Sequence, residues 1–84
     1  MLSQLTGSPK VVGAKQTKRA LTEGKALTVY LAEDADPRIT EAVRDLSQAC
    51  GVPVVDVPMM KELGRACGIA VGAAVAALVR ESGF

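Results

Sequence analysis

The side chains that most often carry catalysis are scarce in this chain of 84 residues. Histidine is absent, so no serine has the base that a hydrolytic triad requires. Cys50 and Cys67 lie seventeen positions apart without a Cys-x-x-Cys spacing, and two thiols without histidine complete a zinc site only if carboxylates join them. We interpret both as small buried thiols. The sequence therefore predicts no enzyme, with no catalytic residue, no metal and no cofactor.

Two carboxylates, Asp34 and Asp36, are spaced as a pair that could hold Mg²⁺. Asp36 directly precedes Pro37 and a well-patterned helical segment. A carboxylate at that position accepts hydrogen bonds from the free N–H groups of the first turn. We therefore prefer to interpret Asp36 as a helix cap rather than as a metal ligand.

Binding chemistry is better represented, beginning at a glycine turn before a polar helical segment. Helix N-termini attract phosphate through free N–H groups and the helix dipole. Lys15 and Arg19 share one face of such a helix, with Gln16 at its edge. Lysine and arginine donate to guanine O6 and N7, and glutamine both donates and accepts at base edges. An ordinary solvated first turn explains the same residues, and spacing alone favours that simpler interpretation.

A second segment, residues 64–72, contains three glycines and a short run of apolar residues. Gly64, Gly68 and Gly72 are spaced by four, which indicates close packing and turns. Ile69, Ala70 and Val71 form a short apolar loop after Gly68. These side chains either tuck into the core or offer an apolar surface to a ligand such as an unstacked base; the sequence leaves both open.

Helical and strand patterns alternate around these segments. Strands are predicted at 11–12, 27–32, 52–57 and 73–79, and helices at 15–23, 37–50 and from Pro58 to about Cys67. Gly24, Gly51 and Gly68 follow the three helices as stop signals. The strands are apolar on both faces, which predicts an α/β fold, a sheet covered by helices on each side as an α/β/α sandwich.

Composition limits the whole chain to one small domain, residues 1–84, with a mass of 8.7 kDa and 49% hydrophobic residues. Tyr30 and Phe84 are the only aromatic residues, which argues against RNA-binding domains that stack bases on aromatic platforms. Net charge is +1, but residues 10–25 carry five cations against one carboxylate, whereas residues 33–45 carry five carboxylates against two arginines. No signal segment is evident, and the longest apolar run, residues 69–79, is too short to cross a membrane.

Three runs of residues occur together in a recognisable order. They are Gly13-Ala14-Lys15-Gln16-Thr17 with Arg19, Ala32-Glu33-Asp34-Ala35-Asp36-Pro37, and Lys61-Glu62-Leu63-Gly64-Arg65-Ala66-Cys67-Gly68-Ile69. In this order the chain resembles the L-seven-Ae superfamily of kink-turn RNA-binding ribosomal proteins, and within it the short ribosomal-protein-like branch of Gram-positive bacteria. The similarity covers roughly residues 3–80.

The resemblance implies an α/β/α sandwich with a four-stranded mixed sheet. It also implies binding to kink-turns, which are RNA duplexes bent at a three-nucleotide bulge followed by tandem sheared G·A pairs. The site residues that it implies fall into a helix entering the major groove, a loop covering the bulge, and more weakly matched positions near the flipped base. They are, in that order, Gly13, Ala14, Lys15, Gln16, Lys18 and Arg19; Gly68, Ile69, Ala70 and Val71; and Asp36, Thr40 and Lys61.

The chain departs from the family pattern at two positions. Ala70 stands where many relatives carry Glu, and Met59 stands where a Ser usually caps the following helix. The expected protein is a cytoplasmic monomer whose partner is RNA, including possible ribosomal RNA, with no DNA and no membrane. Two alternatives stay open: a constitutive structural protein of the large ribosomal subunit, and a protein-interaction domain that has lost RNA binding.

Overall fold

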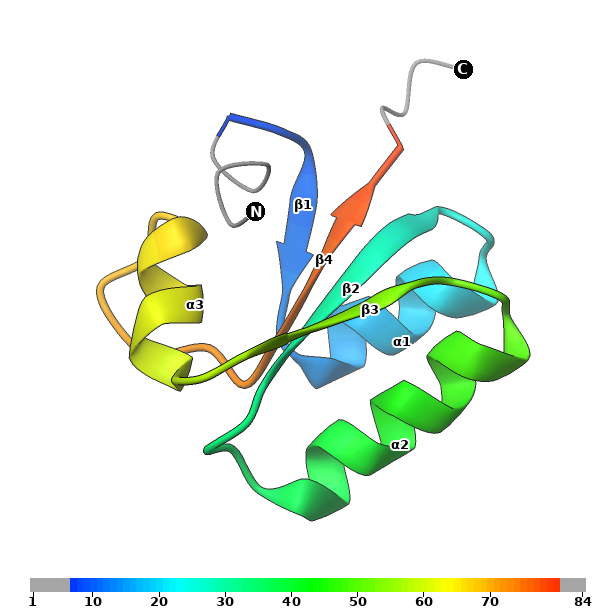
Figure 1. Ribbon diagram of the computed structural model, residues 1–84. Helices are drawn as coiled ribbons and strands as arrows, with labels where there is room; N and C mark the ends of the chain where they lie inside the picture. The colour runs from blue at the N-terminus through cyan, green and yellow to red at the C-terminus, as the bar shows by residue number, and fades with distance from the viewer. Residues whose placement is uncertain (1–6, 81–84) are drawn as a thin grey trace.

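Strands and helices alternate along the chain in the computed structural model, which describes residues 7–80 (Figure 1). The elements in chain order are β1 (Lys10–Val12), α1 (Ala14–Thr22), β2 (Ala26–Ala32), α2 (Pro37–Ala49), β3 (Val54–Val57), α3 (Met60–Ala66) and β4 (Val75–Val79). Helices α1 and α2 cover one face of the sheet, and α3 lies on the other (Figure 1). The predicted α/β/α sandwich is confirmed.

The sheet is mixed, with the strand order β1-β4-β2-β3. Strand β4 is antiparallel to both β1 and β2, whereas β2 and β3 are parallel. A parallel pair requires a crossover connection, and α2 supplies it between β2 and β3. The last strand of the chain therefore lies inside the sheet, between the first two.

Alternating side chains of the central strands fill two cores. Val29 and Leu31 of β2 pack with Val75 and Ala77 of β4 under α1 and α2. Tyr30 and Ala32 point to the other face, with residues of α3 such as Leu63 in their cluster. Since both faces are covered, the strands contain consecutive apolar residues, as the sequence analysis predicted.

Two predicted strands are shorter than their apolar runs. Strand β3 starts at Val54 rather than Val52, because the Val52 N–H donates to the Ser47 carbonyl and still closes α2 (2.9 Å). Strand β4 starts at Val75 rather than Ala73. The Ala73 N–H donates to the Met60 carbonyl of α3 (3.0 Å), so this residue belongs to the loop that returns along α3.

The buried face of α2 contains two hydroxyl residues. Its buried residues are Thr40, Val43 and Ser47, whereas Ile39 is 40% exposed. The Ser47 hydroxyl donates to the Val43 carbonyl at 2.7 Å. A small hydroxyl residue can lie in the core when its own helix accepts the hydrogen bond, so hydrophobicity alone did not identify this face.

The interpretation of both cysteines as buried is wrong for Cys50. Cys67 is buried beneath α3, but Cys50 is exposed. The reason is that the end of α2 lies at the surface, since Gln48, Ala49 and Gly51 around Cys50 are exposed as well. Burial raises the pKa of the Cys67 thiol.

Candidate nucleic-acid interface

The ends of several helices and strands lie close together at one end of the sheet. The Gly13 N–H, just before α1, donates to the Val75 carbonyl at the start of β4 (2.8 Å). The Ala32 N–H, at the end of β2, donates to the Ala74 carbonyl (2.9 Å). The starts of α1 and β4 and the β2–α2 loop (residues 33–36) are thereby brought together. We call this end of the sheet the loop end.

Helix α1 begins at the loop end. Gly13 is its N-cap, with φ 104° and ψ 152° and no side-chain cap. This positive φ favours glycine, so backbone conformation explains Gly13 without any requirement for close approach by a ligand. The first turn carries no acidic residue, so nothing there neutralises the positive end of the helix dipole.

The predicted base-contacting side chains of α1 point to solvent. Lys15, Gln16, Lys18 and Arg19 are all exposed, whereas Ala14 is half-buried and packs against the core under α1 and α2. Thr17, which lies between Gln16 and Lys18 in the helix, is fully buried. The structure therefore separates the four polar residues from the two that hold the helix on the sheet.

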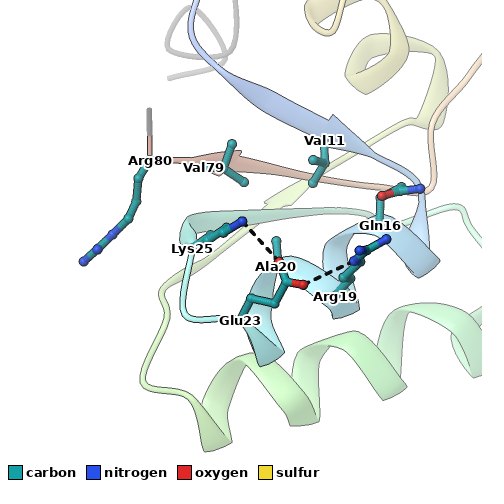
Figure 2. A pocket seen from close by; sticks show the side chains of 8 residues that line it. All are labelled: Val11, Gln16, Arg19, Ala20, Glu23, Lys25, Val79 and Arg80. Carbon is teal, nitrogen blue, oxygen red and sulfur yellow. Dashed lines mark hydrogen bonds and ion pairs between the residues drawn. The ribbon is translucent and has the colours of Figure 1, made fainter. Parts of the chain in front are cut away.

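Arg19 has a partner that the sequence analysis did not assign. Its Nε lies 3.3 Å from Glu23 Oε2, and Lys25 Nζ lies 3.4 Å from Glu23 Oε1. Both contacts are drawn in Figure 2. Hydrogen bonds from Arg19, and then from Lys25, lower the pKa of Glu23. The i, i+4 spacing of Arg19 and Glu23 was the available signal.

The loop after α3 exposes its apolar side chains. Val71 is 70% exposed and Ile69 is 37% exposed, and Gly68 and Ala70 are also exposed. Of the two alternatives left open by the sequence, the structure supports an apolar surface rather than side chains tucked into the core.

Backbone contacts hold this loop against α3. The Ile69 N–H donates to the Gly64 carbonyl (3.1 Å). A Cβ on Gly64 would lie 2.0 Å from the Val71 carbonyl oxygen, and one on Gly72 would lie 3.1 Å from Met60 Cβ. The close packing predicted for Gly64 and Gly72 is confirmed, and the loop follows α3 closely.

The missing cap at Met59 is supplied by a distant residue. Met59 is the N-cap of α3 and makes no side-chain hydrogen bond there. Asp34 Oδ1, in the β2–α2 loop, accepts from the Met60 N–H at 2.8 Å. Because these residues are 26 positions apart, no local motif indicated the contact.

Asp36 and Thr40 have structural partners in α2. Asp36 Oδ1 accepts from the Arg38 N–H at 2.9 Å, which confirms the predicted cap. Its other oxygen lies 2.8 Å from Arg38 Nη2, and hydrogen bonds from Arg38 lower the pKa of Asp36. Thr40 is buried, and its hydroxyl lies 3.5 Å from the carbonyls of Asp36 and Pro37.

The surroundings of Thr40 are acidic. A hollow of about 300 Å³ beside it is lined by Glu33, Glu41 and Asp56, with Arg44 as its cation. Arg44 is held by Asp56 at 2.6 Å, so this hollow offers little to an anion. Lys61, in contrast, is exposed in the first turn of α3.

Other kinds of site find no geometric support in residues 7–80. No three His, Cys, Asp or Glu side chains in this part of the chain gather as metal ligands. None of its helices combines the length and the hydropathy needed to cross a membrane.

Comparison with known proteins places this geometry in a family. Residues 5–84 match the model of the ribosomal protein L7Ae/L30e/S12e/Gadd45 family. The chain belongs to this family.

Relatives in the L7Ae/L30e/S12e/Gadd45 family are similar along most of their length. An RNA-binding protein of Geobacillus sp. (strain WCH70) is 54% identical over 76 residues, which are 90% of this chain and 93% of that protein. The RNA-binding protein YbxF of Geobacillus stearothermophilus is 53% identical, covering 83% of this chain and 85% of that protein. The large ribosomal subunit protein eL8 of Halobacterium salinarum is 41% identical, covering 88% of this chain and 62% of that protein.

A solved structure supports the same assignment. The Giardia lamblia 15.5kD RNA binding protein superposes with a TM-score of 0.82 at 30% identity, covering 96% of this chain and 67% of that one. The family shares the fold described above, and the resemblance found in the three sequence runs is confirmed.

Proposed function

We propose that this protein binds RNA and stabilises the bent form of kink-turns. The observation that carries the proposal is the exposed polar face of α1, with Lys15, Gln16, Lys18 and Arg19 beside an uncapped N-terminus. Family membership and the RNA-binding relatives support RNA as the partner.

The two exposed segments suit different parts of one bent duplex. In the proposal, α1 enters the major groove at the tandem G·A pairs, where Lys15 and Gln16 contact guanine edges. Arg19 contacts the same guanines or the phosphates next to them. The loop with Ile69, Ala70 and Val71 covers the unstacked bulge nucleotides through apolar contact. Gly68 allows the turn into this loop, and Lys61 contributes a cation from α3.

Asp36 and Thr40 act indirectly in this proposal. Asp36 is occupied as a cap and Thr40 is buried, so both position the start of α2 rather than offer a free polar group. Any contact with the flipped base then comes from the surface that they support.

The proposed mechanism is a shift in population. Free RNA samples extended and bent forms, and a protein that binds only the bent form draws the equilibrium toward it. Moving that equilibrium from about 1:99 to about 99:1 requires roughly 5.5 kcal/mol of differential affinity. A helix in the groove and an apolar loop on the bulge supply this affinity only in the bent geometry.

A fluorescence energy-transfer titration tests the proposal. A kink-turn labelled on its two arms should close as the protein is added. A matched duplex whose sheared G·A pairs are replaced by Watson–Crick pairs should stay open. Equal affinity for both RNAs would favour a protein-interaction domain instead, and absence of closure at micromolar protein would refute the proposed function.

A second candidate function is a constitutive place in the large ribosomal subunit. The similarity to eL8 of Halobacterium salinarum favours it. Co-sedimentation with large subunits through high salt would support this role, whereas release at high salt would favour transient binding to several RNAs. Under either role, we expect a cytoplasmic monomer.

A further inference from the structure

A hollow of about 330 Å³ lies along the flank of α1, next to β1 and the end of β4. Figure 2 shows the apolar side chains of Val11 and Val79 on its strand side. Gln16 and Arg19 also line it, so it adjoins the face of α1 that is proposed to contact bases. Its lining also contains Glu23, Lys25 and Arg80, to which the proposed function assigns no role.

Arg19 forms one arrangement with two of these groups, Glu23 and Lys25. The carboxylate of Glu23 lies between Arg19 and Lys25, with Nε to Oε2 at 3.3 Å and Nζ to Oε1 at 3.4 Å. Figure 2 shows both cations pointing toward this carboxylate. Arginine and lysine at this spacing match an anion that presents two oxygens.

The backbone fixes the base of Lys25 within this arrangement. The Lys25 N–H donates to the Ala20 carbonyl (2.9 Å), and the Lys25 carbonyl accepts from the Arg80 N–H (3.0 Å). The turn after α1 is therefore tied to both the helix and β4. Arg80 adds a further cation at the outer end of the hollow, with its side chain extending away from the others (Figure 2).

We propose that this hollow is a binding site for a phosphate of the RNA backbone, and that Glu23 occupies it until RNA displaces its carboxylate. The inference rests on the proposed function, because α1 must first lie in the groove. A phosphodiester and a carboxylate are both monoanions with oxygens that accept from arginine and lysine. Exchange therefore leaves Arg19 and Lys25 partnered in both states.

Because the site is exposed to solvent, its own affinity for an anion is low. The side chains of Arg19, Lys25 and Glu23 are 73%, 57% and 41% exposed, and exposed ion pairs contribute little because water screens them. A free anion therefore competes poorly with a carboxylate attached to the same helix. A phosphate delivered by neighbouring groove contacts has a high effective concentration, which favours RNA as its source.

The test measures kink-turn affinity against salt concentration for Glu23→Gln, Lys25→Gln and the double variant. Glu23→Gln should tighten binding by about twofold to fivefold, the range typical of an exposed ion pair. Lys25→Gln should weaken binding and reduce the slope of log Kd against log salt by about 1. In the double variant, the gain from Glu23→Gln should shrink, because one of the two competing partners is gone.

Asp45→Asn on α2 is the matched control, since it removes one negative charge from an exposed position outside the hollow. A gain equal to that of Glu23→Gln would overturn the inference in favour of a general charge effect. Wild-type affinity and slope in all hollow variants would also overturn it while leaving kink-turn binding intact. If the wild-type protein closes no kink-turn, the proposed function itself fails.

Inorganic phosphate distinguishes the source of the anion. At matched ionic strength, replacing chloride by millimolar phosphate should leave the Arg19 Nε–H resonance unchanged, whereas the kink-turn should shift it. A saturating shift with phosphate alone would overturn the assignment to RNA and indicate a site for free phosphate.

Discussion

The exposed face of α1 distinguishes residues that can contact a ligand from residues that hold the helix in place. Gln16 and Arg19 are exposed, whereas Thr17 between them is completely buried. Helical geometry allows this separation, because neighbouring positions point about 100° apart. Substitutions one position apart should therefore affect binding and stability independently.

Removing base contacts should weaken RNA binding without unfolding the protein. Gln16→Ala and Arg19→Ala should each cost about 1–3 kcal/mol of kink-turn affinity if they donate to base edges. Isothermal titration with a kink-turn measures this loss. Thr22→Ala, at the far end of the same helix, is the control and should bind as the wild type does. Losses below twofold for both variants would remove α1 from the interface.

Thr17 makes a separate prediction about stability. Its hydroxyl is buried and has no hydrogen-bond partner within the described part of the chain, and such a group costs roughly 1–3 kcal/mol. Thr17→Val keeps the shape and removes the hydroxyl, so it should raise the free energy of unfolding by about 1 kcal/mol. Urea denaturation measures the change.

Ser47 provides the contrast for Thr17. It is equally buried, but its hydroxyl donates to the Val43 carbonyl. Ser47→Ala should therefore lower stability or leave it unchanged. Destabilisation by Thr17→Val would indicate that its hydroxyl has a water or backbone partner after all.

At the scale of elements, α3 and the loop that follows it behave as one unit. Met60, the first residue of α3, links the helix to the end of this loop, because its carbonyl accepts from the Ala73 N–H. Its own N–H donates to Asp34 in the β2–α2 loop. Gly64 lets the loop backbone approach the helix. The sequence predicted the helix and its glycine stop, but not its cap, because the cap lies on another loop.

Asp34 should position the apolar loop through this unit. Asp34→Ala removes the cap and should cost about 1 kcal/mol of stability, with faster amide exchange in residues 60–73 and weaker kink-turn binding. Asp34→Asn keeps an acceptor oxygen and should restore most of both properties. Hydrogen exchange of the full chain provides the readout. Unchanged exchange in Asp34→Ala would show that α3 holds the loop without this contact.

At the scale of the whole molecule, a net charge of +1 conceals an uneven distribution. The cations of α1 lie on its exposed face. On the side of α2, the acidic residues Glu33 and Glu41 line the hollow beside Thr40. A near-neutral protein can therefore attract an anion on one side. Local charge, rather than the total, should govern affinity for RNA.

Salt dependence tests that distribution. The three cations on the exposed face of α1 should contribute about 2–3 to the slope of log Kd against log salt. Affinity measured in a potassium chloride series gives the slope. The slope should be unchanged in Asp45→Asn, although its net charge is higher. A slope near zero would contradict phosphate contact by α1, and a slope that follows net charge would contradict local control.

The sequence by itself determined the alternation of strands and helices, the glycines that end the helices, the Asp36 cap and the polar face of α1. These features depend on periodicity and on hydrogen bonds between residues a few positions apart. The three ordered runs also identified the family, which the match over residues 5–84 confirms.

Only the tertiary structure decided which of these segments meet. The order β1-β4-β2-β3 places the last strand beside the first, which brings Gly13 to Val75. The parallel pairing of β2 with β3 brings Asp34 to Met60. The tertiary structure also decided that Ile69 and Val71 face solvent and that Cys50 is exposed. Such contacts depend on how the elements pack, and local patterns carry no record of that packing.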